Sequence, residues 1–259
     1  MPRFKLYVEY AGTRYSGWQI QKNARTVQGE IDRAVATISG RRDFELYGSG
    51  RTDAGVHALA QVAHLDVQTR LAPDDLARAV NDELPADINI LRAERVTHRF
   101  HARHDAVGRS YLYQVALRRT AFAKPFVWWV KDPLDVASMQ AAAGRFGGMH
   151  DFGSFTDAEP GETSMDVLVE AVQLRKVGDL LLVRVEGSHF LWKMVRRMVG
   201  VLVLVGRGEL RADEVERLLA SPSPLVARAT APASGLFLER VFYEGDRRDY
   251  PLVPPLWQG

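Results

Sequence analysis

The segment with the clearest chemical character is GSGRTDAG, residues 48–55, which combines three glycines with one carboxylate, Asp53, and one cation, Arg51. In an extended chain, side chains two residues apart lie on the same side, so these two charges can pair. An arginine beside a carboxylate holds it in a fixed orientation. Glycines allow a large ligand to approach the backbone closely. The segment therefore predicts either a reactive carboxylate beside a large ligand or an Asp–Arg pair that only stabilises a turn.

A phosphate-binding loop is excluded for this segment. Gly50 and Gly55 have the spacing of a P-loop, but the two residues that follow are not the required Lys and Ser or Thr. Asp53 stands where a dinucleotide fingerprint needs its third glycine, and its charge would repel a pyrophosphate. Both flanks are predicted strands, whereas phosphate loops lead from a strand into a helix.

A metal site is a further alternative that the spacing disfavours. Asp53, His57 and His64 would supply single ligands at mixed spacing, with no second carboxylate nearby, so no metal is predicted. Three other histidines recur at every third position but match no metal-binding motif: His98, His101 and His104. We assign these three to a basic face and leave their chemical roles, and that of His57, open.

Arg196 has a distinctive position in a predicted helix at 190–205. One face of this helix is apolar and must be buried, and it comprises Leu191, Met194, Val195, Met198, Val199 and Leu202. Lys193 points away from that face, whereas Arg196 and Arg197 lie on its two flanks. An arginine at the border of a buried face either bonds an anion or extends its head into water.

Arginine carries most of the positive charge. Of 34 Lys and Arg residues 28 are arginines, against 32 acidic residues, for a net charge of +2. The planar guanidinium suits phosphates and stacks on bases. Residues 99–119 hold five arginines and one aspartate, interleaved with Phe100, Tyr111 and Tyr113. This pattern is typical of a groove for single-stranded or distorted RNA, or of a solvated strand face.

The composition excludes several classes of protein. With 46% hydrophobic and 25% charged residues, the chain is typical of globular proteins. The absence of cysteine excludes disulfides and thiolate chemistry. The longest apolar run, MVGVLVLVG, is shorter than the roughly 20 residues that span a bilayer, and the amino terminus lacks the apolar core of a signal peptide. We expect a soluble cytoplasmic protein with no membrane partner.

The order of predicted elements indicates an α+β fold, because strands and helices alternate irregularly. The first half is predicted to hold strands at 3–11, 43–49, 60–67 and 88–96 and helices at 27–39 and 73–84. The second half is predicted to hold strands at 109–117, 126–130 and 236–243, a hairpin at 167–187 and helices at 134–146, 190–205 and 212–220. The predicted division is 1–107, 108–247 and an extended tail at 248–259, with surface loops at 156–164 and 221–234.

Several motifs are similar to those of one known family. GRTDAGVHA at 50–58 closely resembles the signature of the tRNA pseudouridine synthase A family, whose members isomerise uridines in the tRNA anticodon arm. Further motifs follow in the family's order over nearly the whole chain: YSGWQ at 15–19, VNDELP at 80–85, FHAR at 100–103, RSYLY at 109–113, DFGSF at 151–155, FLWKMVRRMVG at 190–200 and APASGLFLERVFY at 231–243.

The resemblance implies two ferredoxin-like halves that share a central, mainly antiparallel sheet, with the active-site cleft between them. It also implies a homodimer that binds tRNA across both protomers, acts at nucleotides 38, 39 and 40 and needs no cofactor. Asp53 would be the nucleophile, Tyr111 would lie against the uracil, Arg196 would pair with Asp53 and Arg51 would hold the nucleotide out of its stack. Two alternatives stay open, an RNA-binding module without catalysis and a carboxylate-dependent nucleosidase.

Overall fold

The computed structural model describes residues 1–158 and 164–255. The chain forms two compact units. Unit 1 comprises Met1–Val107 and Phe237–Asp246, and unit 2 comprises Gly108–Leu236 and the described residues from Arg247 onward. One unit is therefore built from two segments that lie far apart in the sequence.

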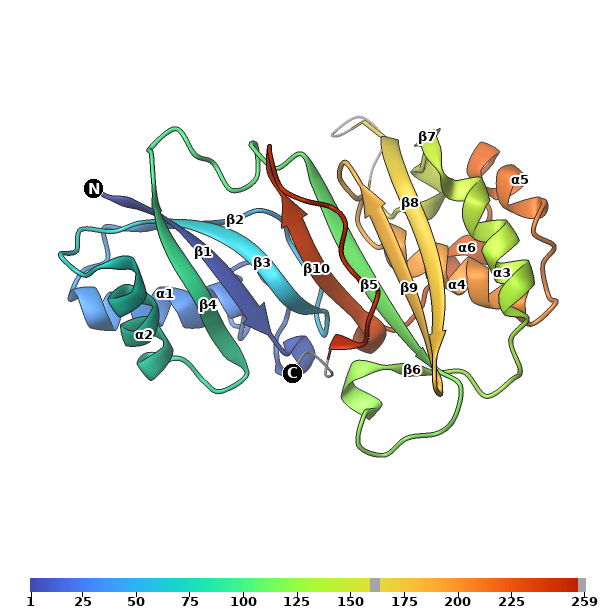
Figure 1. The fold of residues 1–259 in the computed structure, drawn as a ribbon, viewed down its shortest axis with the longest axis horizontal. Coiled ribbons are helices and arrows are strands. Elements are labelled where there is room, and N and C mark those ends of the chain that lie inside the picture. The colour runs from blue at the N-terminus through green and yellow to red at the C-terminus, as the bar shows by residue number, and fades with distance from the viewer. Residues whose placement is uncertain (159–163, 256–259) are drawn as a thin grey trace. The chain divides into compact units, whose positions relative to one another are not determined.

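Unit 1 is a complete ferredoxin-like βαββαβ unit (Figure 1). In chain order its elements are β1 (Arg3–Tyr10), α1 (Val27–Ser39), β2 (Glu45–Gly48), β3 (His57–Asp66), α2 (Pro73–Glu83) and β4 (Ile88–Val96). The antiparallel strands run in the order β4-β1-β3. Strand β2 pairs in antiparallel fashion with the last residues of β3, on the side away from β1. Strand β10 (Leu236–Phe242) pairs in parallel with the first residues of β3.

Local signals account for the first helix of unit 1. The Thr26 hydroxyl oxygen accepts a hydrogen bond from the Gly29 N–H at 3.2 Å, which satisfies one of the free donors at the start of α1. Gly40 ends the helix in the left-handed conformation, with φ of +64°. These bounds are the predicted ones.

Unit 2 has the order β-α-β-β-α with additions. Its main elements are β5 (Gly108–Ala116), α3 (Val136–Ala143), β8 (Asp166–Val177), β9 (Leu180–Gly187) and α4 (Met194–Gly206). The antiparallel strands run β5-β9-β8-β7 and β6 lies parallel to β5. The additions are β6 (Trp128–Trp129), β7 (Gly148–Asp151), α5 (Glu214–Ala220) and α6 (Pro224–Arg228). Short 3₁₀ turns occur at Gly12–Arg14, Lys124–Phe126, Gly144–Phe146, Gly153–Phe155 and Ala233–Gly235.

The α+β class and the mainly antiparallel pairing are confirmed, and three details differ from expectation. The strand predicted at 236–243 was expected in the second half of the chain, but its residues from Phe237 onward belong to unit 1. The segment 221–234 contains α6 and buried residues such as Val226 and is no simple surface loop. Strand β7 was not predicted, since its four residues are largely exposed. The predicted loop at 156–164 lies largely outside the described residues, and the shared sheet with its cleft stays a prediction.

The described part of the C-terminal tail is held against unit 2 along its backbone. The buried Arg184 guanidinium donates to the carbonyl oxygens of Tyr250 and Pro251, at 3.1 and 2.9 Å. Arg248 forms an ion pair with Glu170. Leu252 is buried. The tail is thus attached mainly through its main-chain carbonyls, which an extended segment leaves available to donors such as Arg184.

No helix within residues 1–158 or 164–255 is both long and apolar enough to cross a membrane.

Candidate active site

The loop that carries Asp53 connects β2 to β3, and its first residues are fixed by a buried glutamine. The Ser49 N–H donates to the Val62 carbonyl at 2.7 Å, and the Ser49 hydroxyl donates to Gln61 Oε1 at 2.7 Å. The Gln61 amide donates in turn to the Gly50 carbonyl at 3.0 Å. Gln61 is fully buried, so these bonds anchor the loop to the strand that follows it.

Contacts on both sides of Asp53 fix its backbone. Thr52 is buried, its hydroxyl shares a 2.8 Å hydrogen bond with that of Tyr10, and its carbonyl accepts from the Trp18 N–H at 3.1 Å. On the other side, the Val56 N–H donates to the Asp53 carbonyl at 3.1 Å and closes a turn. The Asp53 side chain itself is half-buried. A carboxylate is therefore presented from a backbone with little freedom.

The three glycines of the loop serve different purposes. Gly55 has φ of +79°, a conformation that side chains disfavour. A Cβ on Gly48 would lie 2.6 Å from the indole nitrogen of Trp18, so this glycine permits packing within the protein. Gly50 has no heavy atom within 4 Å of where a Cβ would stand. Ligand access, which we attributed to all three glycines, fits the open space at Gly50 and does not fit Gly48.

His57, whose role the sequence left open, supports the end of the loop. Its Nδ1 accepts a hydrogen bond from the Gly12 N–H at 3.0 Å, and its ring stacks on Phe237 with centroids 4.7 Å apart. The ring is 1% exposed. These contacts assign His57 a structural role in unit 1.

A small cavity opens beside the loop. It has a volume of about 30 Å³ and is lined by Trp18, Gln19, Gln28, Tyr47, Gly48, Gly50, Arg51 and Arg103. Arg51 and Arg103 are both exposed. The sequence singled out Arg51 but gave no role to Trp18 or Arg103, although both lie in motifs that resemble the family's, YSGWQ and FHAR.

The two remaining predicted site residues belong to unit 2. Tyr111 lies on β5, is half-buried, and meets Phe190 edge to face with centroids 5.3 Å apart. Arg196 lies on α4 and is half-buried, with its Nε donating to the Ala231 carbonyl at 2.7 Å.

Helix α4 is more deeply buried than its predicted single face. The predicted apolar residues are all buried, but so are Gly200, Val201, Val203, Val205 and Gly206. Arg197 is 3% exposed and ion-paired with Asp157, which also accepts from the Lys193 ammonium at 2.7 Å. Hydrogen bonds from Lys193 and Arg197 lower the pKa of the Asp157 carboxyl. The expectation that Arg197 is an ordinary flank residue is wrong, because α4 is covered on nearly all sides.

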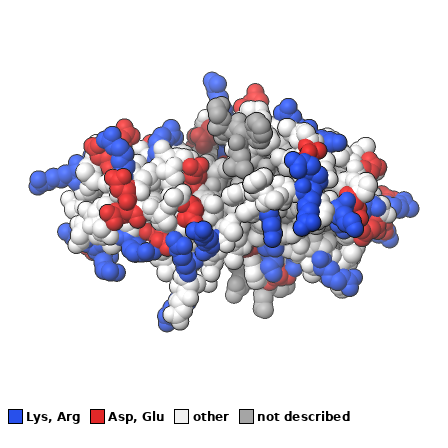
Figure 2. All heavy atoms as spheres, turned by 90° about the horizontal axis from the view of Figure 1, so that it is seen from below, with Lys and Arg blue, Asp and Glu red and all other residues white. Residues whose placement is uncertain are grey.

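The arginines and aromatic residues of the segment 99–119 have different surroundings, so they do not all belong to one exposed RNA-binding face. Tyr113 is fully buried and donates its hydroxyl to the Pro232 carbonyl at 2.7 Å. Arg118 pairs with Asp179 at 2.5 Å, and Arg109 donates to the Ser188 carbonyl at 3.0 Å. On the face shown in Figure 2, Lys and Arg stand among Asp and Glu rather than in one basic patch.

Three of the histidines form an aromatic cluster with Tyr47 in unit 1. The ring of His64 is stacked on Tyr47 at 5.7 Å, His101 lies 4.7 Å from His64, and His104 lies 4.2 Å from His101. Burial of His64, followed by the nearby charges of Arg3 and His101, lowers its pKa to about 4. In the described parts of the chain, no three His, Cys, Asp or Glu side chains are grouped as a metal ion would require.

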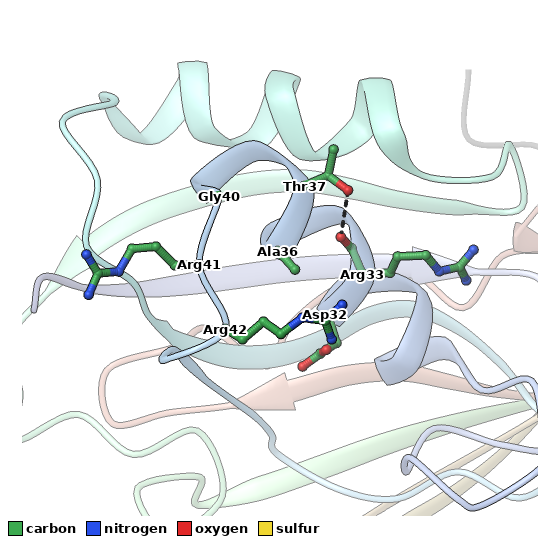
Figure 3. Close-up of a pocket in the computed structure, with 7 residues that line it drawn as sticks. All are labelled: Asp32, Arg33, Ala36, Thr37, Gly40, Arg41 and Arg42. Atoms are coloured by element: carbon green, nitrogen blue, oxygen red, sulfur yellow. Dashed lines mark hydrogen bonds between the residues drawn. The ribbon is translucent and has the colours of Figure 1, made fainter.

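A larger hollow of unit 1 lies elsewhere. It has a volume of about 540 Å³ at the C-terminal end of α1, before β2, whereas the Asp53 loop follows β2 (Figure 3). Two of its arginines are paired with acidic neighbours, Arg41 with Asp43 and Arg33 with Glu30. We therefore place the candidate site at the Asp53 loop.

Comparison with known proteins identifies the chain. The sequence pattern of the family described as tRNA pseudouridine synthase matches residues 6–105 and 142–244, which include the Asp53 loop and α4. The tRNA pseudouridine synthase A of Nitrobacter winogradskyi is 43% identical over 248 residues, covering 95% of this chain and 97% of that protein. That of Halalkalibacterium halodurans is 40% identical over 242 residues, covering 93% and 92%.

These matches define the class as pseudouridine synthases, isomerases that act on uridine in RNA. The chain belongs to the tRNA pseudouridine synthase family, and its reaction is the isomerisation of uridine to pseudouridine in tRNA. A solved structure, "Crystal Structure of a Cbf5-Nop10-Gar1 Complex", aligns over 77% of this chain and 54% of that chain with 11% identity and a TM-score of 0.30, too low to bear on the fold.

Proposed function

We propose that this enzyme modifies uridines at positions 38, 39 and 40 of the tRNA anticodon arm, with Asp53 as the nucleophile. One observation carries the assignment: the carboxylate at the centre of the family-like motif 50–58 is presented half-buried from a backbone held on both sides. A fixed carboxylate is suited to transient covalent attack, because the ester-like adduct that it forms can also leave.

The reaction breaks the N1–C1′ bond of uridine, turns the uracil and joins its C5 to C1′. In one route, the Asp53 carboxylate attacks C1′ and uracil leaves with the bonding electrons. C5 then attacks C1′ and the carboxylate leaves. The proton on C5 is released, and N1, which kept the electrons of the broken bond, takes up a proton. In the other route, the carboxylate first adds to C6 of the uracil. Both routes regenerate Asp53 and release the hydrogen from C5.

Three further residues complete the proposed site. A target base inside a paired stem must leave its stack before it can react. We assign Arg51, which is exposed on the loop, to hold the nucleotide in the extruded position. We assign Tyr111 to contact the uracil ring and Arg196 to act as the cation for Asp53. These roles follow from the motifs at 50–58, 109–113 and 190–200, which are similar to those of the family.

Assembly and location are part of the same proposal. We expect a cytoplasmic homodimer that binds tRNA across both protomers, in line with the family resemblance. Light scattering of the purified protein, alone and with tRNA, measures the mass of the complex. A monomer that binds and modifies tRNA at full rate would contradict the dimeric part of the proposal.

Tritium release tests the chemistry. tRNA labelled with tritium at uridine C5 should lose label to water when it is isomerised, whereas an RNA-binding module would release none and a nucleosidase would leave an abasic site. Substrates with a single uridine at position 38, 39 or 40 test the position.

The matched variant is Asp53→Asn, which keeps the shape of the side chain but is not a competent nucleophile. Its rate should fall below about a hundredth of the parent rate, whereas tRNA affinity should stay within a few-fold, because phosphate contacts dominate affinity. A variant that keeps more activity than this would rule out Asp53 as the nucleophile.

A further inference from the structure

The connection between β9 and α4 ends in a tight turn. The Met194 N–H donates to the Leu191 carbonyl at 3.1 Å, which places Trp192 and Lys193 at the two central positions of the turn. Leu191 and Met194 are both buried, so the turn is anchored on each side. Trp192, by contrast, is 53% exposed, the most of any tryptophan at the described positions. The turn therefore presents a large aromatic side chain to the surface from a fixed backbone.

Lys193 has a backbone conformation that a lysine disfavours. Its φ is +63°, in the left-handed region where this position of a turn usually has glycine. Such a conformation persists where the surrounding contacts hold it. The Lys193 ammonium makes two contacts, since it donates to Asp157 at 2.7 Å and lies over the Trp192 ring, 4.5 Å from its centroid. The disfavoured residue thus holds a cation over the exposed ring.

The same connection also carries residues assigned to the substrate or in contact with them. Phe190 meets the ring of Tyr111 edge to face, and Tyr111 is the residue assigned to the uracil. Arg196, assigned to the charge of Asp53, lies in the first turn of α4. Trp192 stands between them in the chain, after the aromatic partner of Tyr111 and before Arg196. An exposed ring at this place is suited to a second contact with the same substrate.

The charge around the turn favours a nucleic acid as that partner. Residues 188–200 contain three cations and no acidic residue, and Asp157 is the carboxylate that pairs with two of them, Lys193 and Arg197. Positive charge beside an exposed aromatic ring suits a polyanion whose bases stack on aromatic side chains. Unpaired bases are the ones that can turn toward such a ring, because they are not held in a helix.

We propose that Trp192 stacks on an unpaired base of the anticodon loop, with Lys193 as the positioning residue that fixes the ring. The stacked base is distinct from the target uridine, which is assigned to Tyr111. This inference rests on the proposed function, because it takes the anticodon arm as the RNA that is bound.

Single abasic nucleotides test the contact. Anticodon stem-loop RNAs, each with one loop nucleotide that lacks its base, are bound to Asp53→Asn protein so that turnover plays no part. At one position the missing base should weaken binding about tenfold, the loss expected for one stacked base. The same missing base should matter less than about twofold once Trp192→Ala has been added. Trp192→Tyr keeps an aromatic ring and should keep most of the loss.

The matched control is Trp129→Ala. Trp129 is 41% exposed and has the Arg119 guanidinium 5.8 Å from its ring centroid, but it lies on β6 and not in the connection before α4. This variant should keep the tenfold loss.

Lys193→Asn tests the positioning role. Asparagine tolerates the left-handed conformation but brings no ammonium to the ring, so the missing base should then cost only about threefold. A full tenfold loss in this variant would overturn the role of Lys193.

Equal losses in the parent and in Trp192→Ala at every loop position would overturn the contact. A Trp192→Ala protein whose mass by light scattering falls to that of a monomer, with the losses unchanged, would assign the ring to a protein interface instead. The result is separable from the proposed function. A parent enzyme that releases tritium but shows no coupling refutes only the stacking contact, whereas a parent that releases no tritium refutes the function.

Discussion

The Asp53 loop and helix α4 both combine arginines with an important carboxylate, yet they hold their charges in opposite ways. In the loop, buried neutral groups such as Gln61 and Thr52 fix the backbone, and the arginines Arg51 and Arg103 stay exposed. In α4, Arg197 is itself buried and paired with Asp157. Arg51 thus stays exposed on the loop, whereas the helix uses one of its cations for folding. An arginine's surroundings, and not its frequency in the sequence, separate the two uses.

The largest expected effect separates the two adjacent arginines of α4. Arg196→Met should lower tritium release by at least about a hundredfold if Arg196 is the cation for Asp53. It should also cost about 1–3 kcal/mol of unfolding free energy, because the Ala231 carbonyl loses a charged donor. Arg196→Lys should recover part of the activity, since a positive charge is kept without the planar fork.

The control for that prediction is Arg197→Met, which should keep the parent rate per folded molecule. Equal losses of turnover at the two positions would show that we have misassigned the side of α4 that serves the reaction.

The second prediction is that removing Asp157 from the Arg197–Asp157 pair costs more stability than removing Arg197. Asp157→Ala leaves a buried guanidinium without its partner and should cost about 3–5 kcal/mol of unfolding free energy. Arg197→Met leaves Asp157 with Lys193 and with 38% of its side chain exposed, so the cost should stay below about 1.5 kcal/mol. Urea unfolding of the two variants measures both costs, and the reverse order would contradict the burial of Arg197.

The third prediction uses His64, on the strand that follows the loop. Its pKa of about 4 in the folded protein is below the unfolded value of 6.5. At a pH between these two values, the unfolded chain therefore binds a proton on His64 that the folded protein does not bind. The free energy of unfolding should therefore have its full value above about pH 6.5 and should fall by roughly 3 kcal/mol as the pH drops to about 4. His64→Gln should remove this part of the pH dependence. If the unfolding free energies of parent and variant depend on pH in the same way, the proton is bound by a group other than His64.

The smallest expected effect distinguishes two glycines of the loop. Gly48→Ala would force a Cβ against the Trp18 ring and should cost about 1–3 kcal/mol of unfolding free energy. Gly50→Ala meets no atom within 4 Å and should leave stability unchanged or raise it by up to about 1 kcal/mol. If a ligand approaches at Gly50, the same change should weaken tRNA binding. Thermal unfolding and filter binding measure the two effects.

Local features of this fold could be predicted from the sequence because their causes are local. The start and end of α1 follow from the side chain of Thr26 and the left-handed conformation of Gly40. The role proposed for Asp53 rests on the motif at 50–58 and stays a prediction. Periodicity also predicted the helix at 190–205, but it assigned that helix one buried face, whereas segments distant in sequence cover the rest. The Ala229 carbonyl, for example, is so close to Gly200 that a Cβ there would stand 1.6 Å from it.

Pairings between distant segments could not be predicted. Nothing in the alternation of LFLERVF shows that β10 belongs beside β3, because a strand's pattern records which face is buried and not which strand lies next to it. The burial of Arg197 has the same cause, since its partner Asp157 lies 40 residues earlier. The division between exposed and structural arginines in 99–119 likewise depends on partners such as Asp179 and Ser188.

The placement of β10 has a consequence for synthesis of the chain on the ribosome. Residues 1–96 contain all six elements of the ferredoxin-like unit, so they can collapse as soon as they leave the exit tunnel. Phe237 and Leu238, which pair with the first residues of β3, are made some 180 residues after His57 and Ala58. Until then the edge beside the Asp53 loop lacks its neighbour, and the long sequence separation makes that closure slow. The segment that carries Asp53 is therefore the last part of unit 1 to reach its final form, and a truncated nascent chain would hold the whole motif at 50–58 without the strand that pairs beside it.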